Sequence, residues 1–205
     1  MLIATGEPPP REYRVAIANL RPTQMTVGYA EVAHKRFAFR NRRDTRRLAE
    51  KVVPVVVGPR GVYVLDRHHW ICAGTAEGAR DFPVRVKARL ETLSEAAFWS
   101  TLDERGWCHP YDSEGRRQDY SAVPELMSEL QDDPFRSLVG SLRRAGVIDK
   151  TRAPYSDFAW ANFLRHRISR SEIESDYAAT LKNAKQLVAE RRGLEEEGGA
   201  QSPSP

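Results

Sequence analysis

The chain has 205 residues, of which 40% are hydrophobic and 29% are charged, and its formal net charge is +4. A chain of this length can bury a sizeable core, and a mean hydropathy of −0.58 excludes an integral membrane protein. The N-terminal residues lack a basic segment followed by a long apolar one, which excludes a secretion signal. We therefore expect a cytoplasmic protein with no membrane partner.

Hydrophobic patterning in the first half of the chain predicts a small sheet. Alternating or β-branched stretches predict strands at residues 13–20, 52–57, 62–65 and 82–90. The turn Gly58-Pro59-Arg60-Gly61 separates the second strand from the third, so these two should form a hairpin. Helices are expected from about residue 27 to 39 and from 70 to 78. The predicted order is β-α-β-β-α-β.

The second half of the chain is predicted to be helical. Ser94 is a typical N-cap residue, and further helices should begin near Ala122, Pro134, Tyr155 and Ser171. From Arg191 the chain is charged and then rich in glycine, serine and proline, which predicts disorder. The expected fold class is α+β, with a small mixed sheet and helices in residues 1–92, an all-helical C-terminal extension in 93–190 and a disordered tail in 191–205.

The segment Asp66-Arg67-His68-His69 lies between a predicted strand and a predicted helix. Backbone N–H groups at a helix start lack intrahelical acceptors and the helix dipole is positive there, so an anion such as phosphate is favoured. Arg67 and the two histidines add hydrogen-bond donors. Asp66 can cap the helix, orient an imidazole or help to hold a divalent metal. The alternative is that Asp66 is only an N-cap and that the histidines are incidental polar residues.

The basic residues and the cysteines are less specific signals. Basic side chains are concentrated between His34 and Lys51, and they form either a solvated face or an anion-attracting surface. Cys72 and Cys108 match no metal-ligand spacing, and we expect both to be reduced packing residues.

Several segments resemble the ParB-like nuclease branch of the ParB/sulfiredoxin superfamily, over about residues 15 to 190. The similar segments are Leu20–Gln24, Val27-Gly28, Glu31-Val32, Lys35, Val53–Pro59, Asp66–His69, Phe98-Trp99, Asp132–Leu138 and Phe158–Arg165. The resemblance implies that the Asp66–His69 turn binds nucleotide phosphates. His68-His69-Trp70 stands where other branches have an arginine pair or a Cys-His-Arg sequence. The branch usually has histidine at the position of Arg67. Arg67 therefore departs from the pattern, and the resemblance does not imply a role for it.

The same resemblance implies roles for residues outside the turn. Superfamily members that phosphorylate free serine use a glutamate in the helix after the first strand as general base, and Glu31 is similarly placed. Lys35 and Thr23 are expected to join Arg67, His68 and His69 in phosphate binding. Glu31 could instead be a surface residue paired with Lys35. Arg136 and Arg165 could reach the pocket from the helical half, or could pair with Asp132 or Asp133 within it.

The leading functional hypothesis is a nucleotide-dependent phosphotransferase acting on a hydroxyl-bearing small molecule. Its expected cofactors are ATP or another nucleotide and Mg²⁺, with Asp66 and Glu31 as metal ligands and with Glu31, Asp66, His68 and His69 as catalytic residues. The alternatives are a metal-dependent nuclease and a nucleotide-binding DNA partner without catalysis. The absence of a recognition helix and of a heptad run argues against a chromosome-partitioning protein. A cysteine at the turn, which sulfiredoxin chemistry needs, is also absent.

Overall fold

The computed structural model describes residues 13–40, 51–149 and 156–199, with side chains up to residue 192. These residues form two compact units. The sheet unit contains the described residues up to Val27 and those from Val32 to Gln131. The helical unit contains residues Gly28–Glu31 and the described residues from Asp132 onward. Residues 93–131, which we expected to belong to a helical extension, therefore group with the sheet.

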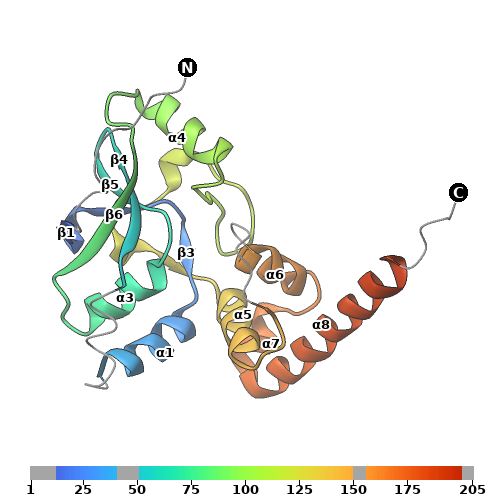
Figure 1. Ribbon diagram of the computed structural model, residues 1–205. Coiled ribbons are helices and arrows are strands. Elements are labelled where there is room, and N and C mark those ends of the chain that lie inside the picture. Colours follow the sequence, from blue (N-terminus) through green and yellow to red (C-terminus); the bar gives the residue numbers. More distant parts are fainter. Residues whose placement is uncertain (1–12, 41–50, 150–155, 200–205) are drawn as a thin grey trace, which may run out of the picture. The chain divides into compact units, whose positions relative to one another are not determined.

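A five-stranded mixed sheet organises the first unit (Figure 1). The order of its strands is β1-β6-β4-β5-β2. The strands β4 and β5 form the predicted antiparallel hairpin, and β1 is antiparallel to β6. The pairs β2–β5 and β4–β6 are parallel. The fold class α+β is thus confirmed. The strands are β1 (Tyr13–Ala16), β2 (Leu20–Pro22), β4 (Val53–Gly58), β5 (Gly61–Val64) and β6 (Asp81–Arg89).

The first predicted strand, residues 13–20, is divided by a single 3₁₀ turn, η1 (Ile17–Asn19). The reason is topological. The strand β1 pairs with β6 at one edge of the sheet, whereas β2 pairs with β5 at the opposite edge. The chain must cross the sheet between the two strands, and η1 makes this crossing. A separate two-stranded ladder joins β3 (Thr26–Val27) to β7 (Gln131–Asp132).

Helices α1 (Tyr29–Arg40), α3 (His68–Ala76) and α4 (Glu95–Glu104) accompany the sheet strands in the chain. Ile71 of α3 is fully buried among the side chains of a first apolar cluster. Phe98 and Leu102 of α4 belong to a second apolar cluster, which includes Val56 and Tyr63 of the sheet. Burial of α4 against the sheet explains why residues 93–131 belong to the sheet unit.

A helix was expected to begin near Ala122, and this prediction is wrong. The chain there forms two 3₁₀ turns, η2 (Tyr120–Ala122) and η3 (Met127–Glu129). Met127 and Leu130 are nearly completely buried in the first apolar cluster. The segment from Tyr120 to Leu130 is therefore not an α-helix, but its side chains Met127 and Leu130 still pack into the core of the sheet unit.

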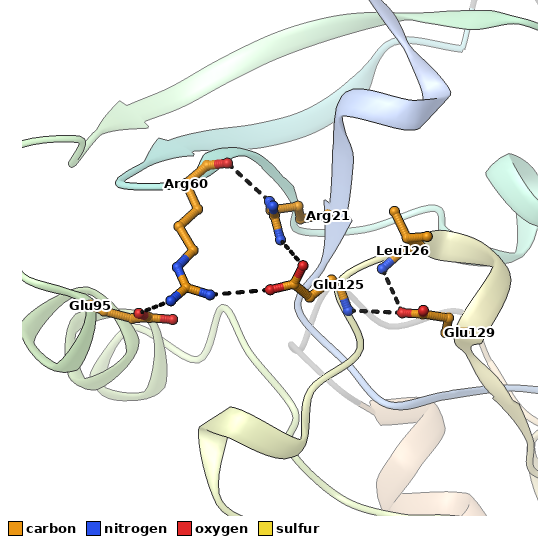
Figure 2. Close-up of polar contacts among 6 residues, drawn as sticks. All are labelled: Arg21, Arg60, Glu95, Glu125, Leu126 and Glu129. Carbon is orange, nitrogen blue, oxygen red and sulfur yellow. Dashed lines mark hydrogen bonds and ion pairs between the residues drawn. The ribbon is translucent and has the colours of Figure 1, made fainter.

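Polar contacts around Arg21 connect β2 to three other segments (Figure 2). The Nε of Arg21 donates to the carbonyl oxygen of Arg60 at 3.0 Å. Arg60 pairs with Glu95 at 2.9 Å and with Glu125 at 3.1 Å, and Glu129 accepts the backbone N–H of Glu125 at 3.1 Å. Arg21 thus holds β2 against the hairpin turn, just before Thr23.

The helical unit packs four helices around one core. The core includes Leu138, Leu142, Leu164 and Val188. The predicted tail is wrong in its first part, because α8 continues through Arg191 to Gly199; residues 200–205 lie outside the described residues. Within the described part of the chain, none of the helices is both long and apolar enough to span a membrane. The four helices are α5 (Pro134–Arg144), α6 (Ser156–Arg165), α7 (Arg170–Ser175) and α8 (Tyr177–Gly199).

The first turn of α1 belongs to the helical unit. The backbone N–H of Tyr29 donates to Oδ1 of Asp132 at 2.6 Å, and that of Ala30 donates to Oγ of Ser137 at 3.2 Å. A Cβ at Gly28 would lie 2.6 Å from the backbone nitrogen of Ser137, so only glycine permits this approach. The start of α1 is therefore capped by residues from the far half of the chain.

Candidate phosphate-binding turn

The turn before α3 has an unusual backbone at Arg67. Its φ of 74° is left-handed, and Arg67 is the only non-glycine residue with a positive φ among the described residues. Oδ1 of Asp66 accepts the backbone N–H of Arg67 at 2.6 Å. The N-cap of α3 is thus Arg67, not Asp66 as one alternative proposed. Left-handed backbone costs about 1–2 kcal/mol in an L-residue, and such strain is concentrated at functional sites.

His68 is a buried structural residue of this turn. It is 3% exposed, and its Nε2 accepts the backbone N–H of Thr23 at 3.3 Å. We assign its proton to Nδ1 on the basis of this bond. His68 was expected to donate to an anion or to be an incidental polar residue, and the structure instead shows it buried as an acceptor that holds the turn.

Thr23 is likewise engaged in holding the turn. It is 1% exposed, and its hydroxyl donates to the carbonyl oxygen of Val64 at 2.7 Å. Its own carbonyl oxygen accepts the backbone N–H of His109 at 2.8 Å. Thr23 therefore fixes the end of β2 against β5, and the structure gives it a positioning role.

The side chains of Arg67 and His69 are the donors of the turn that remain partly exposed. The Nε of Arg67 is buried and has no hydrogen-bond acceptor among the described residues. Leaving a buried donor unsatisfied is costly, more so in a charged group. An anionic ligand would supply the missing acceptor. Asp66 is exposed and follows directly after the hairpin.

Two lysines lie next to Trp70, in the first turn of α3. The Nζ of Lys51 is 3.7 Å from the centroid of the indole ring and that of Lys35 is 5.5 Å from it. Phe39, one helical turn after Lys35, contacts the same ring edge-on at 5.6 Å. A Cβ at Gly74 would lie only 3.1 Å from the ring of Phe39. Glycine at this position allows α1 and α3 to approach and brings Lys35 to the turn.

At the other end of α3, two arginines of α1 share one carboxylate. Glu77 pairs with Arg36 at 2.7 Å and with Arg40 at 2.8 Å. Hydrogen bonds from Arg40 and Arg36 lower the pKa of Glu77 to about 2. Arg36 and Arg40 of α1 thus pair with Glu77, whereas Lys35 lies beside Trp70.

Glu31 has its described partners in the helical unit. Its carboxylate pairs with Arg144, whose guanidinium also donates to Oγ of Ser141 at 2.8 Å. A Cβ at Gly140 would collide with the carboxylate, so Glu31 packs closely on α5. The ion pair observed for Glu31 is therefore with Arg144, whereas the sequence suggested Lys35.

Arg136 and Arg165 also have partners in the helical unit. Arg165 pairs with Asp133 at 2.6 Å, which confirms the structural alternative for this arginine. Asp133 is 2% exposed, and its Oδ1 accepts the backbone N–H of Phe135 in the first turn of α5. Burial raises the pKa of Asp133, whereas the positive charges of Arg165 and Arg136 act to lower it. The guanidinium of Arg136 lies 3.9 Å from the ring centroid of Phe158.

No group of three or more histidine, cysteine, aspartate or glutamate side chains that could hold a metal occurs among the described residues. Asp66 and Glu31, the expected metal ligands, belong to different units. Mg²⁺ binding at the turn stays a prediction, with Asp66 as the residue able to contribute.

Comparison with known proteins identifies the family. The family model described as "Putative ParB-like nuclease" matches residues 13–166. The chain belongs to this family. It is also similar to the crystal structure of protein Atu1540 from Agrobacterium tumefaciens, with 39% identity, a TM-score of 0.79, and coverage of 87% of this chain and 92% of that chain. No curated protein matches.

A more remote similarity is to the C-terminally truncated chromosome-partitioning protein ParB from Caulobacter crescentus, crystallised with the centromeric parS site. The identity is 12% and the TM-score 0.31, with coverage of 94% of this chain and 100% of that chain. A similarity of this size carries no argument about function.

In this ParB-like chain, the sequence placed Lys51 in the basic stretch and Trp70 after the histidine pair without indicating a contact between them, and it gave no role to Arg144. Lys51 precedes β4 and Trp70 lies in α3, so no spacing in the sequence indicates that they touch. Arg144 is 113 residues from Glu31. The one available signal was the placement of His68-His69-Trp70 where related branches have basic residues.

Proposed function

We propose that this protein binds the phosphates of a nucleotide at the start of α3 and transfers a phosphoryl group to a hydroxyl of a small molecule. The observation that carries the proposal is the state of Arg67. Its backbone is held in a left-handed conformation and its buried Nε has no acceptor in the described part of the chain. Strained backbone and an unsatisfied cationic donor at one residue are typical of a ligand-binding position.

In this proposal Arg67 and His69 donate to the phosphate oxygens, while His68 and Thr23 keep the turn in place. Backbone N–H groups at the helix start add to the attraction for an anion. We assign Lys35 to the same ligand because it lies beside the first turn of α3. A Mg²⁺ ion bound with the nucleotide would neutralise charge on the phosphates, and Asp66 suits the one or two carboxylates by which that ion is usually held.

The acceptor hydroxyl needs a base at the turn, and we assign this role to Asp66. Its Oδ1 is engaged by Arg67, and its side chain is exposed. In the transfer, the acceptor oxygen forms a bond to the terminal phosphorus, its proton moves to the Asp66 carboxylate, and the bond to the leaving nucleoside diphosphate breaks. Glu31 is the second candidate for the general base, because its carboxylate forms an ion pair with Arg144.

The test is transfer of labelled terminal phosphate from nucleotides to a panel of small hydroxyl compounds. The wild-type chain should label at least one acceptor. Replacement of Arg67 by glycine should abolish binding, and Asp66→Asn should abolish transfer with binding retained. Failure of the wild type to bind any nucleotide would overturn the proposal.

A nuclease is the second candidate, favoured by one further observation. Arg85, Lys87 and Arg89 are exposed at alternate positions of β6, about 6.7 Å apart by strand geometry. Arg89 pairs with Glu91 at 3.4 Å, whereas no ion pair joins Arg85 or Lys87 to another described residue. Such a row suits a phosphodiester backbone. Cleavage of plasmid DNA that is lost in an Arg85→Gln, Lys87→Gln variant would support this function over phosphotransfer.

A further inference from the structure

A stacked pair of rings lies in the loop that follows α4. The imidazole of His109 and the phenol ring of Tyr111 have centroids 4.3 Å apart, and their planes are 23° from parallel. Pro110 separates the two residues, and the backbone N–H of Tyr111 donates to the carbonyl oxygen of His109 at 2.9 Å. This three-residue turn suits the fixed φ of proline, and the two rings lie side by side at its ends.

Hydrogen bonds within the loop fix its shape. The backbone N–H of Gln118 donates to the carbonyl oxygen of Pro110 at 2.8 Å. The backbone N–H of Asp112 donates to the carbonyl oxygen of Arg116 at 3.0 Å. In return, the Asp112 carboxylate accepts the backbone N–H groups of Glu114 and Arg116, each at 2.9 Å. A ring held by such a loop loses little conformational freedom when a ligand stacks on it.

Thr23 joins this loop to the rest of the proposed site. Its carbonyl oxygen accepts the backbone N–H of His109 at 2.8 Å, and its own N–H donates to Nε2 of His68 at 3.3 Å. Its hydroxyl donates to the carbonyl oxygen of Val64, two residues before Asp66. One residue therefore connects the ring pair both to the phosphate-binding turn and to the segment that leads to the proposed base.

Tyr111 presents a partly exposed ring in this loop. The ring stacks on His109, and among the described residues no second ring and no cationic group contacts Tyr111. A phenol ring backed by another ring is a surface on which planar groups stack favourably. A saturated ring of the same size gains less there, because it lacks the π-system that makes stacking favourable.

We infer that the hydroxyl-bearing acceptor carries a planar ring, and that this ring stacks on Tyr111. The inference rests on the proposed function and narrows the acceptor from any small hydroxyl compound to an aromatic or heteroaromatic alcohol. The acceptor suits this position better than the base of the nucleotide does. The reacting oxygen must touch the terminal phosphorus, so a ring attached to the acceptor stays near the turn. The base of a nucleoside triphosphate is separated from that phosphorus by two further phosphates and a sugar.

The test compares two alcohols that differ in the flatness of their ring, benzyl alcohol and cyclohexylmethanol. Their Kd values for the full-length chain are measured by ligand-observed NMR in the presence of ADP, and their KM values by transfer of labelled phosphate from ATP. The wild type should bind benzyl alcohol roughly fivefold more tightly than cyclohexylmethanol, as expected for one stacking contact. The KM values should differ in the same direction.

Substitutions of Tyr111 separate stacking from a structural role. Tyr111→Leu should abolish the preference for the planar alcohol and leave the affinity for ADP unchanged. Tyr111→Phe should keep the preference, because phenylalanine retains the ring. Tyr13→Leu is the matched control, since Tyr13 is 51% exposed on β1, and this variant should behave as wild type.

The possible failures differ from one another. Equal Kd values for the two alcohols in the wild type, or a preference that survives in folded Tyr111→Leu, would overturn the inference and leave the proposed function to its own test. Weaker ADP binding by Tyr111→Leu with the alcohol preference intact would assign the ring to the base of the donor, which also overturns the inference. If the wild type binds no nucleotide, the proposed function fails and the inference fails with it.

Discussion

The backbone N–H of Thr23 donates to Nε2 of His68, which lies 45 residues further along the chain. Both residues are almost completely buried. The bond joins the end of β2 to the start of α3, and it holds in place the turn that carries the partly exposed side chains of Arg67 and His69. The two adjacent histidines therefore have different roles, and substitution should separate them.

His68→Ala should lower stability, because it leaves the buried N–H of Thr23 without an acceptor at a cost of about 1–3 kcal/mol. His69→Ala should leave stability close to wild type and weaken nucleotide binding several-fold. Chemical denaturation and binding measured on both variants test this. Equal stability of the two variants would contradict the role given to His68.

Arg67→Gly should retain or raise stability, because glycine adopts a left-handed backbone without the penalty of about 1 kcal/mol that other residues carry. It should nevertheless lose phosphate binding, since the guanidinium is removed. Arg67→Ala is the control, because it removes the same side chain and keeps the strain. The two variants should share the binding defect and differ in melting temperature. Normal binding by a folded Arg67→Gly protein would exclude Arg67 from the site.

Asp66→Asn keeps an oxygen that can accept the N–H of Arg67 and removes the basic carboxylate. Turnover should fall roughly a hundredfold or more with little change in nucleotide affinity, as expected for loss of a general base. Glu31→Gln should instead cost roughly 0.5–1 kcal/mol of stability by weakening the pair with Arg144, and should spare turnover. If turnover collapsed in Glu31→Gln but stayed normal in Asp66→Asn, Glu31 and not Asp66 would be the general base.

The pairing of Glu77 with Arg36 and Arg40 predicts a pH dependence of stability. Because the folded protein holds the pKa of Glu77 at about 2, the unfolded chain takes up the proton first as the pH falls. The stabilisation is therefore fully present above the ordinary glutamate value of about 4.3 and is lost as the pH falls through 2. Denaturation midpoints of wild type and Glu77→Gln should differ at pH 6 and converge toward pH 2. If the difference between the two denaturation midpoints did not change with pH, the stabilisation by Glu77 would not come from its ion pairs with Arg36 and Arg40.

The two cysteines should differ in reactivity. Burial raises the pKa of Cys108 to about 12, whereas Cys72 is only half-buried. Thiolate is the reactive form, so Cys108 should resist a thiol reagent at pH 8 until the protein unfolds. Cys72→Ser leaves Cys108 alone and makes the measurement direct. Fast labelling of that folded variant would contradict the buried position.

Strand positions were predictable from the sequence because alternation records which side chains are buried. The hairpin was predicted from its turn residues, and it forms with Val56 opposite Tyr63. The 3₁₀ turn at Ile17, where the chain crosses from one edge of the sheet to the other, was not predicted. Alternation within one strand does not indicate which neighbouring strand it pairs with. The left-handed Arg67 gave no signal either, since arginine is not a residue that marks such a backbone. The partner of Glu31, Arg144, depends on tertiary packing over more than a hundred residues.

The capping of α1 has a consequence for how the chain is made. Tyr29 and Ala30 emerge from the ribosome more than a hundred residues ahead of Asp132 and Ser137, which accept their N–H groups. Until then the helix start has only water as its partner, and a short helix of this kind is marginally stable on its own. Completion of α1 therefore waits for the distal half of the polypeptide. A nascent chain or proteolytic fragment that ends before α5 would have a frayed first turn of α1.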